Sequence, residues 1–406
     1  MRILIVVDVY PPEVSSAATL IHELAHGLEA VGDEVYVATT FPRHYLSGKA
    51  GGDSLKEFYK EGGVNIIRTK TLPLRKINFV IRGISQLLLP FLVFRKIKKY
   101  IKGDLDGVIV YSPPLPLAVA GRMVKRKYGA KFMLNLWDIF PQNAIDLGVL
   151  KSKLAIKMFE VMEQFAYKNA DVLTFHGEGG RQFLIDNKGI PSQKIFLLHH
   201  WVDFASYGKP LRKDFRKEYD LENKFIFLFA GVMGPAQGLE FLVEVANKVG
   251  DLENVCFLLV GDGMEKPKIA EALKKHNLKN VLVKNFVSAE EYPDLAAIAD
   301  VGVVCLSPQN KTPFLPGKFM GYMAAGKPII AFLNKESDGF GLVEKAHCGY
   351  AVVADNLGEA ERATRELYNM GKGELLKMGS GGLDYAKKHL SLEGAVAKIR
   401  ELLKKD

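Results

Sequence analysis

The feature that most constrains the fold is a regular alternation of short β-branched runs with amphipathic helical stretches. Such alternation is typical of parallel α/β sheets, because each parallel connection needs a helix to return the chain. In the first half, strands are predicted at residues 3–7, 34–39, 64–68, 107–111, 131–136, 172–175 and 195–198, with helices at 17–31, 115–128, 153–168 and 178–187. In the second half, strands are predicted at 225–230, 255–260, 281–285, 301–305, 328–332 and 350–353, with closing helices at 374–389 and 392–405.

A polar and charged segment at residues 204–224 separates the two series of strands and indicates a domain boundary. We therefore predict a Rossmann-like domain at residues 1–204 and a second one at 205–385. The closing residues 386–406 are helical in pattern, and the sequence leaves open whether they return to the first domain. In doubly wound domains the loops at the carboxyl ends of the strands bind ligands, so we expect loops of both halves to line a cleft.

Composition narrows the class of protein. Apolar residues make up 48% of the chain and charged residues 25%, the usual balance of a folded soluble domain. No run approaches the roughly 18 apolar residues that span a bilayer. The N-terminal apolar run has no small-residue cleavage site, which favours a first strand over a signal peptide. Cys256, Cys305 and Cys348 lack metal-ligand spacing, so we expect inert buried thiols in a cytoplasmic protein.

The positive charge is concentrated in one segment. The formal net charge is +9, yet residues 62–103 alone hold ten basic side chains and no acidic one. The apolar run 87–94 inside this segment predicts a basic amphipathic element that lies on an anionic membrane, at the inner face of the cell membrane. The predicted membrane-facing cations are Arg82, Arg95, Lys96, Lys98, Lys99 and Lys102. The alternative is a core helix with a solvated end; nucleic acid is not an expected partner, because no nucleic-acid module is present.

Three glycine-containing loops follow predicted strands of the second half, at residues 230–238, 260–263 and 312–328. Glycines permit close approach of the backbone, and the N–H groups at the start of a helix attract anions. In the third loop, Lys318 adds a point charge suited to phosphate. The alternatives are a ligand-free turn for the first loop, a helix cap for Asp262 and a solvated surface lysine for Lys318.

Four segments of the second half, in the order AGVMGPAQGLEFLVEVA, VGDGMEK, ADVGVVCL and PGKFMGYMAAGKPIIA, resemble the family-four retaining glycosyltransferases of the GT-B fold. The first half agrees, since its opening YPPEVSSAATLIHELAHGLEAVGDEVYVATT resembles their first strand, loop, helix and second strand. NLWDIFPQNAIDLG and HHWVDFASY resemble the branch that transfers amino sugars such as N-acetylfucosamine in polysaccharide assembly. The resemblance implies an α/β fold with two doubly wound Rossmann-like domains.

The resemblance also implies a reaction. A hexosyl or N-acetylhexosaminyl group would pass from a nucleotide-diphosphate sugar, with UDP favoured, to a glycan or a polyprenyl-phosphate-linked acceptor. The transfer would retain the anomeric configuration and need neither a metal nor a cofactor. Lys318 and helix N-termini would stabilise the leaving diphosphate, which itself takes the acceptor's proton.

Site residues follow from the same resemblance. Gly231, Met233, Gly234 and Gln237 would face the donor, Asp262 and Gly263 the nucleoside, Phe286 and Val287 the base, while Leu315 and Pro316 would give backbone N–H groups to the diphosphate. From the first domain, Ser15, Ser16 and Asp138 would approach the donor sugar and acceptor, although Asp138 also suits a turn or a helix cap.

The chain departs from the family pattern at several positions. Pro313 and Gly321 stand where the family usually has two glutamates, the second of which grips the ribose hydroxyls. Val232 and Gln237 replace an Arg and a Lys that clamp the diphosphate, a pair that the amino-sugar branch often lacks too. A non-catalytic relative that binds a glycan, a lipid-linked sugar or a partner transferase is therefore the alternative hypothesis. A sugar-nucleotide epimerase of the same fold has less support, because the expected paired carboxylates are missing.

Overall fold

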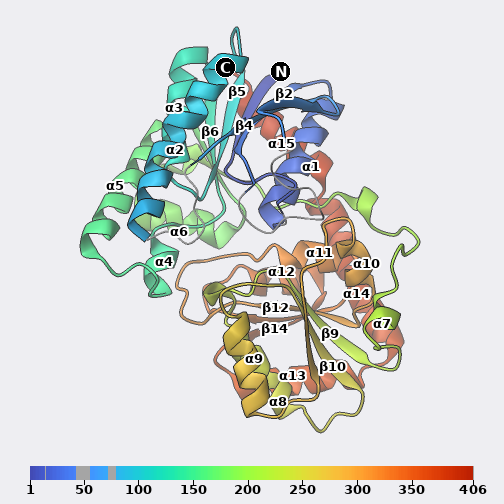
Figure 1. Cartoon of the computed structure of the whole chain (residues 1–406). Coiled ribbons are helices and arrows are strands. Elements are labelled where there is room, and N and C mark those ends of the chain that lie inside the picture. Colours follow the sequence, from blue (N-terminus) through green and yellow to red (C-terminus); the bar gives the residue numbers. More distant parts are fainter. Residues whose placement is uncertain (14, 43–54, 72–78, 406) are drawn as a thin grey trace. The chain divides into compact units, whose positions relative to one another are not determined.

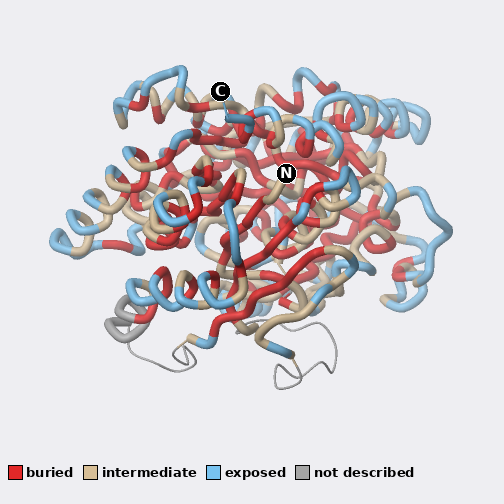
Figure 2. The backbone as a smooth tube through the Cα atoms, turned by 90° about the horizontal axis from the view of Figure 1, so that it is seen from above, coloured by how far each residue is buried: buried red, intermediate tan, exposed pale blue. Residues whose placement is uncertain are grey.

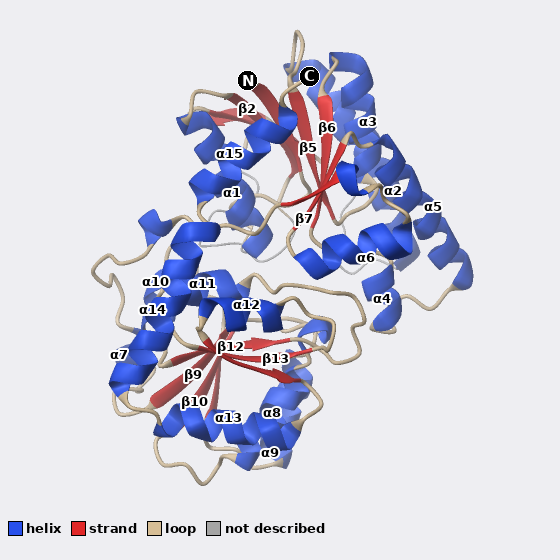
Figure 3. Cartoon of the chain, turned by 180° about the vertical axis from the view of Figure 1, so that it is seen from behind, coloured by secondary structure: helices blue, strands red, loops and turns tan. Residues whose placement is uncertain are grey.

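The computed structural model describes residues 1–13, 15–42, 55–71 and 79–405. The chain forms two compact units (Figure 1). Unit 1 contains residues 1–200 and 392–406, and unit 2 contains residues 201–391. Each unit is a sheet flanked by helices (Figure 3).

Unit 1 is built on eight strands, all but one of which are parallel. The strands are β1 (Arg2–Val6), β2 (Glu34–Thr40), β3 (Phe58–Glu61), β4 (Val64–Thr69), β5 (Gly107–Ser112), β6 (Lys131–Leu136), β7 (Val172–Phe175) and β8 (Ile195–Leu197). Their order is β3-β4-β2-β1-β5-β6-β7-β8, and only β3, at the edge, runs antiparallel to its neighbour. The order reverses between β1 and β5, which makes this pair the switch point of the sheet.

Helices cover both faces of this sheet. They are α1 (Ser16–Ala30), α2 (Phe79–Tyr100), α3 (Leu117–Tyr128), α4 (Gln142–Asp146), α5 (Lys153–Asn169), α6 (Glu178–Lys188) and α15 (Leu392–Leu403). The central strands are buried along their length (Figure 2), because a parallel sheet with helices on both sides has no solvated face. Leu4 and Val6 belong to the core shared with α2 and α3, whereas Gly107 contacts Leu403 of α15.

Unit 2 contains six parallel strands. They are β9 (Phe225–Ala230), β10 (Val255–Val260), β11 (Val281–Lys284), β12 (Val301–Cys305), β13 (Ile329–Leu333) and β14 (Gly349–Val353), in the order β11-β10-β9-β12-β13-β14. The helices are α7 (Phe215–Glu218), α8 (Leu239–Lys248), α9 (Lys266–Lys275), α10 (Tyr292–Ala297), α11 (Lys318–Ala324), α12 (Gly339–Ala346), α13 (Leu357–Asn369) and α14 (Lys372–His389). Separate apolar cores fill the two faces of the sheet.

The last helix returns to unit 1 and packs against α1 (Figure 1). A Cβ at Gly27 of α1 would meet Val396 at 3.0 Å, so the two helices approach closely. Arg400 of α15 pairs with buried Asp33, with 3.1 Å between Nε and Oδ2. The unit boundaries lie a few residues before position 204 and a few after position 386, because α14 runs on to His389 within unit 2.

The strands predicted from alternation are confirmed, with ends that shift by a residue or so. Cys256, Cys305 and Cys348 are buried free thiols, as expected, and burial raises the pKa of each. Strand β3 was not predicted. Helix α2 continues through Pro90, where the sequence indicates a break. Among the described residues, no helix is both long and apolar enough to cross a membrane.

Candidate functional site

The candidate donor site lies where the strand order of unit 2 reverses, between β9 and β12. These strands pair over a short stretch that ends with Gly302 opposite Leu228. Beyond it, the Tyr322 hydroxyl donates to the Leu228 carbonyl at 2.7 Å and accepts from the Ala230 amide at 3.1 Å. It also bonds the Val303 backbone. At the carboxyl ends of β9 and β12, this one side-chain hydroxyl thus takes the place of backbone hydrogen bonds between the strands. Open α/β sheets bind ligands at this edge.

Lys318 and Gly231 lie against one another at this edge. A Cβ at Gly231 would lie 2.9 Å from Lys318 Cε, and the φ angle of Gly231 is +141°, so both the contact and the backbone favour glycine. The Lys318 ammonium lies 4.7 Å from the centre of the Phe229 ring. Burial lowers the pKa of Lys318 to about 8. The side chain therefore remains mostly charged at pH 7, and no acidic side chain among the described residues forms an ion pair with it.

Two of the predicted loops are joined backbone to backbone. The Met233 amide donates to the Asp262 carbonyl at 2.8 Å, and the Glu265 amide donates to the Met233 carbonyl at 2.9 Å. A Cβ at Gly263 would lie 2.3 Å from the Met233 oxygen, which explains this glycine. The prediction that Met233 faces the donor is wrong, because its side chain is fully buried in the core and its backbone bonds the neighbouring loop.

Gln237 and Asp262 each use one polar side-chain atom in a hydrogen bond within their own loop. Gln237 Oε1 accepts from the Gly234 amide at 3.1 Å, and Asp262 Oδ1 accepts from the Gly263 amide at 2.8 Å. Gln237 Nε2 and Asp262 Oδ2 have no partner in the part of the chain that the structure describes, so each remains available to a ligand. Phe286 and Val287 follow β11, where Val287 packs against the core and both are half-buried.

The third loop leads into α11, and the sequence prediction is wrong for one of its residues. Pro316 has no N–H group, so it cannot donate to a diphosphate. The amides of Leu315, Gly317 and Lys318 do not donate to any of the described residues. These three amides, together with the Lys318 ammonium, are the donors that the loop offers to an anion.

Gly321 packs against protein instead of facing a nucleotide. It is buried in α11, and a Cβ there would lie 2.4 Å from the Tyr292 hydroxyl and 2.7 Å from its ring. The ring of Tyr292, the first residue of α10, thus fills the space that a longer side chain at 321 would need. Burial raises the pKa of Tyr292, so the phenol is neutral. A hydroxyl therefore stands next to the position where the family resemblance predicts a carboxylate.

Asp138 follows β6 at the carboxyl edge of unit 1. Its carboxylate has no hydrogen-bond partner among the described residues, so the structure does not show the helix-cap alternative. Desolvation raises the pKa of Asp138 to about 6. A carboxyl group in this range exchanges a proton near neutral pH, a property that is common at functional sites.

Two histidines that the sequence did not indicate lie near Trp137, the residue before Asp138. His176 follows β7, and its Nε2 lies 3.0 Å from the carbonyl oxygen of Trp137. His200 follows β8, its ring lies 4.7 Å from that of His176, and neither of its ring nitrogens has a partner among the described residues. Burial lowers the pKa of His200 to about 4, so the imidazole is neutral at pH 7. The available signal was the position of each histidine within two residues of the end of a predicted strand.

Ser15 and Ser16 lie at the start of α1, after β1. The Ser15 Oγ accepts a hydrogen bond from the Ala18 amide at 3.1 Å and caps the helix. Ser16 is the first helical residue and is exposed. The Ser15 hydroxyl hydrogen remains available for donation, because the cap uses only a lone pair.

The predicted membrane-facing cations of α2 divide into two groups. Lys96 and Lys99 both pair with Glu57, which lowers the pKa of that carboxyl to about 2. This pairing neutralises part of the charge of both lysines, and their membrane role stays a prediction. Arg95, Lys98 and Lys102 are exposed. The side chain of Arg82 lies outside the described residues.

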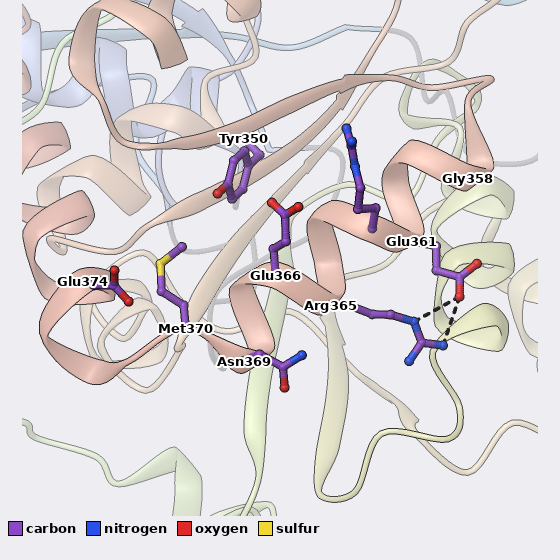
Figure 4. Close-up of a pocket in the computed structure, with 9 residues that line it drawn as sticks. Tyr350, Gly358, Glu361, Arg365, Glu366, Asn369, Met370 and Glu374 are labelled. Atoms are coloured by element: carbon purple, nitrogen blue, oxygen red, sulfur yellow. Dashed lines mark hydrogen bonds and ion pairs between the residues drawn. The ribbon is translucent and has the colours of Figure 1, made fainter.

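A surface pocket of about 660 Å³ lies elsewhere in unit 2, along α13 and β14 (Figure 4). Tyr350, Glu366 and Met370 contribute to its lining, and none of its lining residues is a predicted site residue. Arg365, the obvious anion ligand there, is already held by Asp251 at 2.8 Å and by Glu361 at 3.0 Å. We therefore do not assign the donor site to this pocket.

The three loops of unit 2 lie within the residues that match a known protein family. Residues 224–370 match the family model described as "Glycosyl transferases group 1". The chain is 25% identical to "Probable glycosyltransferase WbjE" of Pseudomonas aeruginosa, over 79% of this chain and 81% of that protein. It is 24% identical to "Putative colanic acid biosynthesis glycosyl transferase WcaI" of Escherichia coli strain K12, over 80% of this chain and 82% of that protein.

Solved structures share the fold of the whole chain. Sucrose-phosphate synthase from Thermosynechococcus elongatus superimposes with a TM-score of 0.78 at 16% identity, covering 99% of this chain and 98% of that one. Anabaena Alr3699/HepE in complex with UDP-glucose superimposes with a TM-score of 0.71 at 15% identity, covering 99% of both chains. None of these findings supports the non-catalytic alternative. The chain therefore has the GT-B fold, and its residues 224–370 match the model of group 1 glycosyl transferases.

Proposed function

We propose that the chain transfers a hexosyl or N-acetylhexosaminyl group from a UDP-sugar to a glycan or polyprenyl-phosphate-linked acceptor, with retention and without a metal. The observation that carries this proposal is the contact between Gly231 and Lys318 at the switch point of unit 2. A buried cation beside a glycine, with free amides next to it, suits a diphosphate better than it suits a structural role. UDP is favoured because a protein of the same fold was solved with UDP-glucose.

The diphosphate would contact Lys318 and the amides of Leu315, Gly317 and Lys318. These donors neutralise the charge that develops on the leaving phosphate, and they are already in place before the reaction begins. Asp262 Oδ2 and the edge of Phe286 would lie towards the nucleoside. Tyr292 takes the place of the absent ribose-binding glutamate, with its neutral hydroxyl accepting or donating a single hydrogen bond.

We assign the acceptor and the transferred sugar to unit 1. Asp138, whose pKa is raised to about 6, orients the acceptor hydroxyl. His200 donates or accepts one hydrogen bond to a sugar hydroxyl, because its buried ring nitrogens have no partner among the described residues. The Ser15 hydroxyl and the exposed Ser16 are further donors at the same edge.

The proposed step conserves atoms and charge. The bond between the anomeric carbon and the diphosphate oxygen breaks, and the acceptor oxygen bonds the anomeric carbon on the same face of the ring. The proton of the acceptor hydroxyl passes to the departing phosphate, whose second negative charge Lys318 stabilises. This step leaves Asp138 an orienting role.

The acceptor class is inferred from chemistry and from one relative of this chain. WcaI is named for colanic acid biosynthesis, which suits a chain that elongates a polysaccharide on a lipid carrier. On α2, Leu87, Leu88, Phe91 and Leu92 are exposed beside Arg95 and Lys98. We propose that this face, here called the α2 apolar face, rests on an anionic membrane at the cytoplasmic side and brings the enzyme to lipid-linked acceptors.

Calorimetric titration with UDP, GDP and ADP tests the donor site. We expect UDP to bind in the presence of a chelator, and GDP and ADP to bind more weakly. If UDP binds, NMR analysis of the sugar released from UDP-hexoses and UDP-N-acetylhexosamines gives both the donor and the anomeric configuration. Absence of binding by all three nucleotides would exclude the donor site proposed here.

A further inference from the structure

Two histidines of α1 and a glutamate of β3 converge at the edge of unit 1. Residues 22–26 are His-Glu-Leu-Ala-His, and the spacing of four places His22 and His26 on one face of the helix. Their rings lie 4.4 Å apart. Glu61, the last residue of β3, faces both of them from a part of the chain that is distant in sequence. No feature of the proposed sugar transfer uses these three residues.

The donor atoms are arranged as ligands of one ion. His22 Nε2 lies 2.9 Å from Glu61 Oε1, and His26 Nε2 lies 3.8 Å from the same oxygen. All three donor atoms lie within 4.8 Å of one another. Zinc bonds to nitrogen and oxygen are about 2.0–2.2 Å long, so the ligands of a tetrahedral site are separated by roughly 3.3–3.5 Å. The two distances to Glu61 lie on either side of this value.

An ordinary ion pair accounts for only one of the two histidines. The bond from His22 to Glu61 has normal length, but His26 Nε2 is buried and has no hydrogen-bond partner among the described residues. A buried polar atom without a partner destabilises the folded state. A cation shared by both imidazoles and the carboxylate would remove this cost.

The ligand types indicate which ion fits the cluster. Imidazole with carboxylate suits zinc better than calcium or magnesium, which prefer sites made of oxygen alone.

The surrounding backbone holds the two elements together. Gly62 has a φ angle of +56°, and a Cβ there would lie 3.2 Å from His26 Cε1, so the turn after β3 is pressed against α1. Strand β3 is the antiparallel edge of the sheet and pairs only with β4 among the described strands. An ion at this point would join the edge hairpin to the helix that begins at Ser16.

We propose that His22, His26 and Glu61 form a zinc site whose fourth position is filled by water, and that the ion fastens the β3–β4 hairpin to α1. The role is structural: the ion stabilises the folded unit 1 and takes no part in the sugar transfer. The proposal does not depend on the proposed function, because it concerns residues that the donor and acceptor sites do not use.

Zinc titration of the untagged full-length chain tests the site. After treatment with a chelator and dialysis, ZnCl2 is added in a calorimeter at pH 7.5, and thermal unfolding is followed in parallel. We expect one zinc per chain with a dissociation constant in the micromolar range or below, and a midpoint of unfolding that rises with zinc concentration. Cobalt substitution should give the absorption bands of a tetrahedral site.

Single variants test whether zinc binds at these three residues. H22A and H26A should weaken zinc binding by at least about tenfold and remove the shift of the unfolding midpoint. E61Q keeps the shape of the side chain and should do the same, which separates loss of a ligand from failure to fold. His276 is a histidine of unit 2 outside the cluster, so H276A is the matched control and should bind like the parent chain. Wild-type affinity in H26A and E61Q, or no stoichiometric binding by the parent chain, would overturn the proposal.

Discussion

Lys318 is the residue on which donor binding depends most directly. Its charge is present at pH 7 and is lost as the pH rises through its lowered pKa of about 8. We therefore expect affinity for UDP to fall between pH 7 and pH 9. K318M should lose about 1.5–3 kcal/mol of UDP binding at pH 7, the usual value of a hydrogen bond to a charged group, and should lose the pH dependence as well. Calorimetry at the two pH values measures both effects.

The control for this prediction is Lys345, an exposed lysine of α12 in the same unit. K345M removes the same formal charge without touching the switch point, so its affinity for UDP should match the parent chain at both pH values. Equal weakening in K318M and K345M would indicate a general charge effect and contradict a direct contact.

Asp138 links catalysis to stability. Because it orients the acceptor as a carboxylate, we expect transfer to decline as the pH falls below about 6, the raised pKa. D138N should reduce transfer by about a hundredfold or more. A folded-state pKa above the ordinary 3.8 means that ionisation opposes folding; this cost is absent near pH 4 and fully present above pH 6. D138N should therefore be more stable than the parent at pH 8, by roughly 1–3 kcal/mol.

Thermal unfolding at pH 8 and at pH 5 checks the sign of this effect. The stability advantage of D138N should shrink at pH 5, where the parent carboxyl is largely protonated. A variant that is less stable than the parent at pH 8 would show that the Asp138 carboxylate is held by favourable contacts, and the assigned environment would then be wrong.

Gly321 shows how packing overrides helix propensity. Alanine favours a helix over glycine by about 1 kcal/mol, but a Cβ at 321 would lie 2.4 Å from the Tyr292 hydroxyl. We expect G321A to destabilise the protein by about 1–3 kcal/mol in urea unfolding, the usual cost of overpacking. G341A, in α12, meets nothing within 4 Å and should be neutral or stabilising. Removal of the ring in Y292A should relieve the effect of G321A; equal destabilisation in both backgrounds would contradict the assigned clash.

Helix α2 is the element that decides membrane binding. Its apolar face includes Leu88 and Phe91, which are 46% and 53% exposed. L88S/F91S should abolish sedimentation with anionic liposomes. R95Q/K98Q should weaken it by about thirtyfold, since each cation near such a surface contributes about 1 kcal/mol. K96Q/K99Q should have a smaller effect, because these side chains already pair with Glu57.

Leu376 of α14 is 68% exposed and provides the matched control for loss of a surface apolar group. L376S should leave liposome binding unchanged. Binding that persists in L88S/F91S would refute the membrane role of the α2 apolar face and favour the alternative of a core helix with a solvated end.

Two elements were difficult to predict for different reasons. Strand β3 is short, lies at the edge and contains Lys60 and Glu61, so neither alternation nor burial marks it. Helix α2 contains Pro90, which removes one hydrogen bond and indicates a break. The helix continues because Leu89, Val93 and Ile97 are buried in the core on one face, and this packing outweighs the lost bond.

At the scale of the whole molecule, the closing helix shows the limit of pattern analysis. The amphipathic pattern of α15 requires an apolar partner but does not say which one. The structure places it on α1, where Arg400 pairs with Asp33 and Lys131 donates to the Lys404 carbonyl at 2.5 Å. Each of these contacts joins residues hundreds of positions apart, which no local pattern records.

The sequence by itself determined the α/β class, the strands of both sheets except β3, and the three glycine loops, because hydrophobic period and turn residues are local properties. It also indicated Lys318, through its place in the third glycine loop, and Asp138, through the family resemblance. Only the tertiary structure decided that Tyr292 fills the space beside Gly321, that Met233 belongs to the core, and that the ring of His200 lies near that of Trp137. Those facts depend on which side chains, distant in the sequence, pack against one another in the folded chain. Two side chains cannot occupy the same space, and no local pattern records which one does.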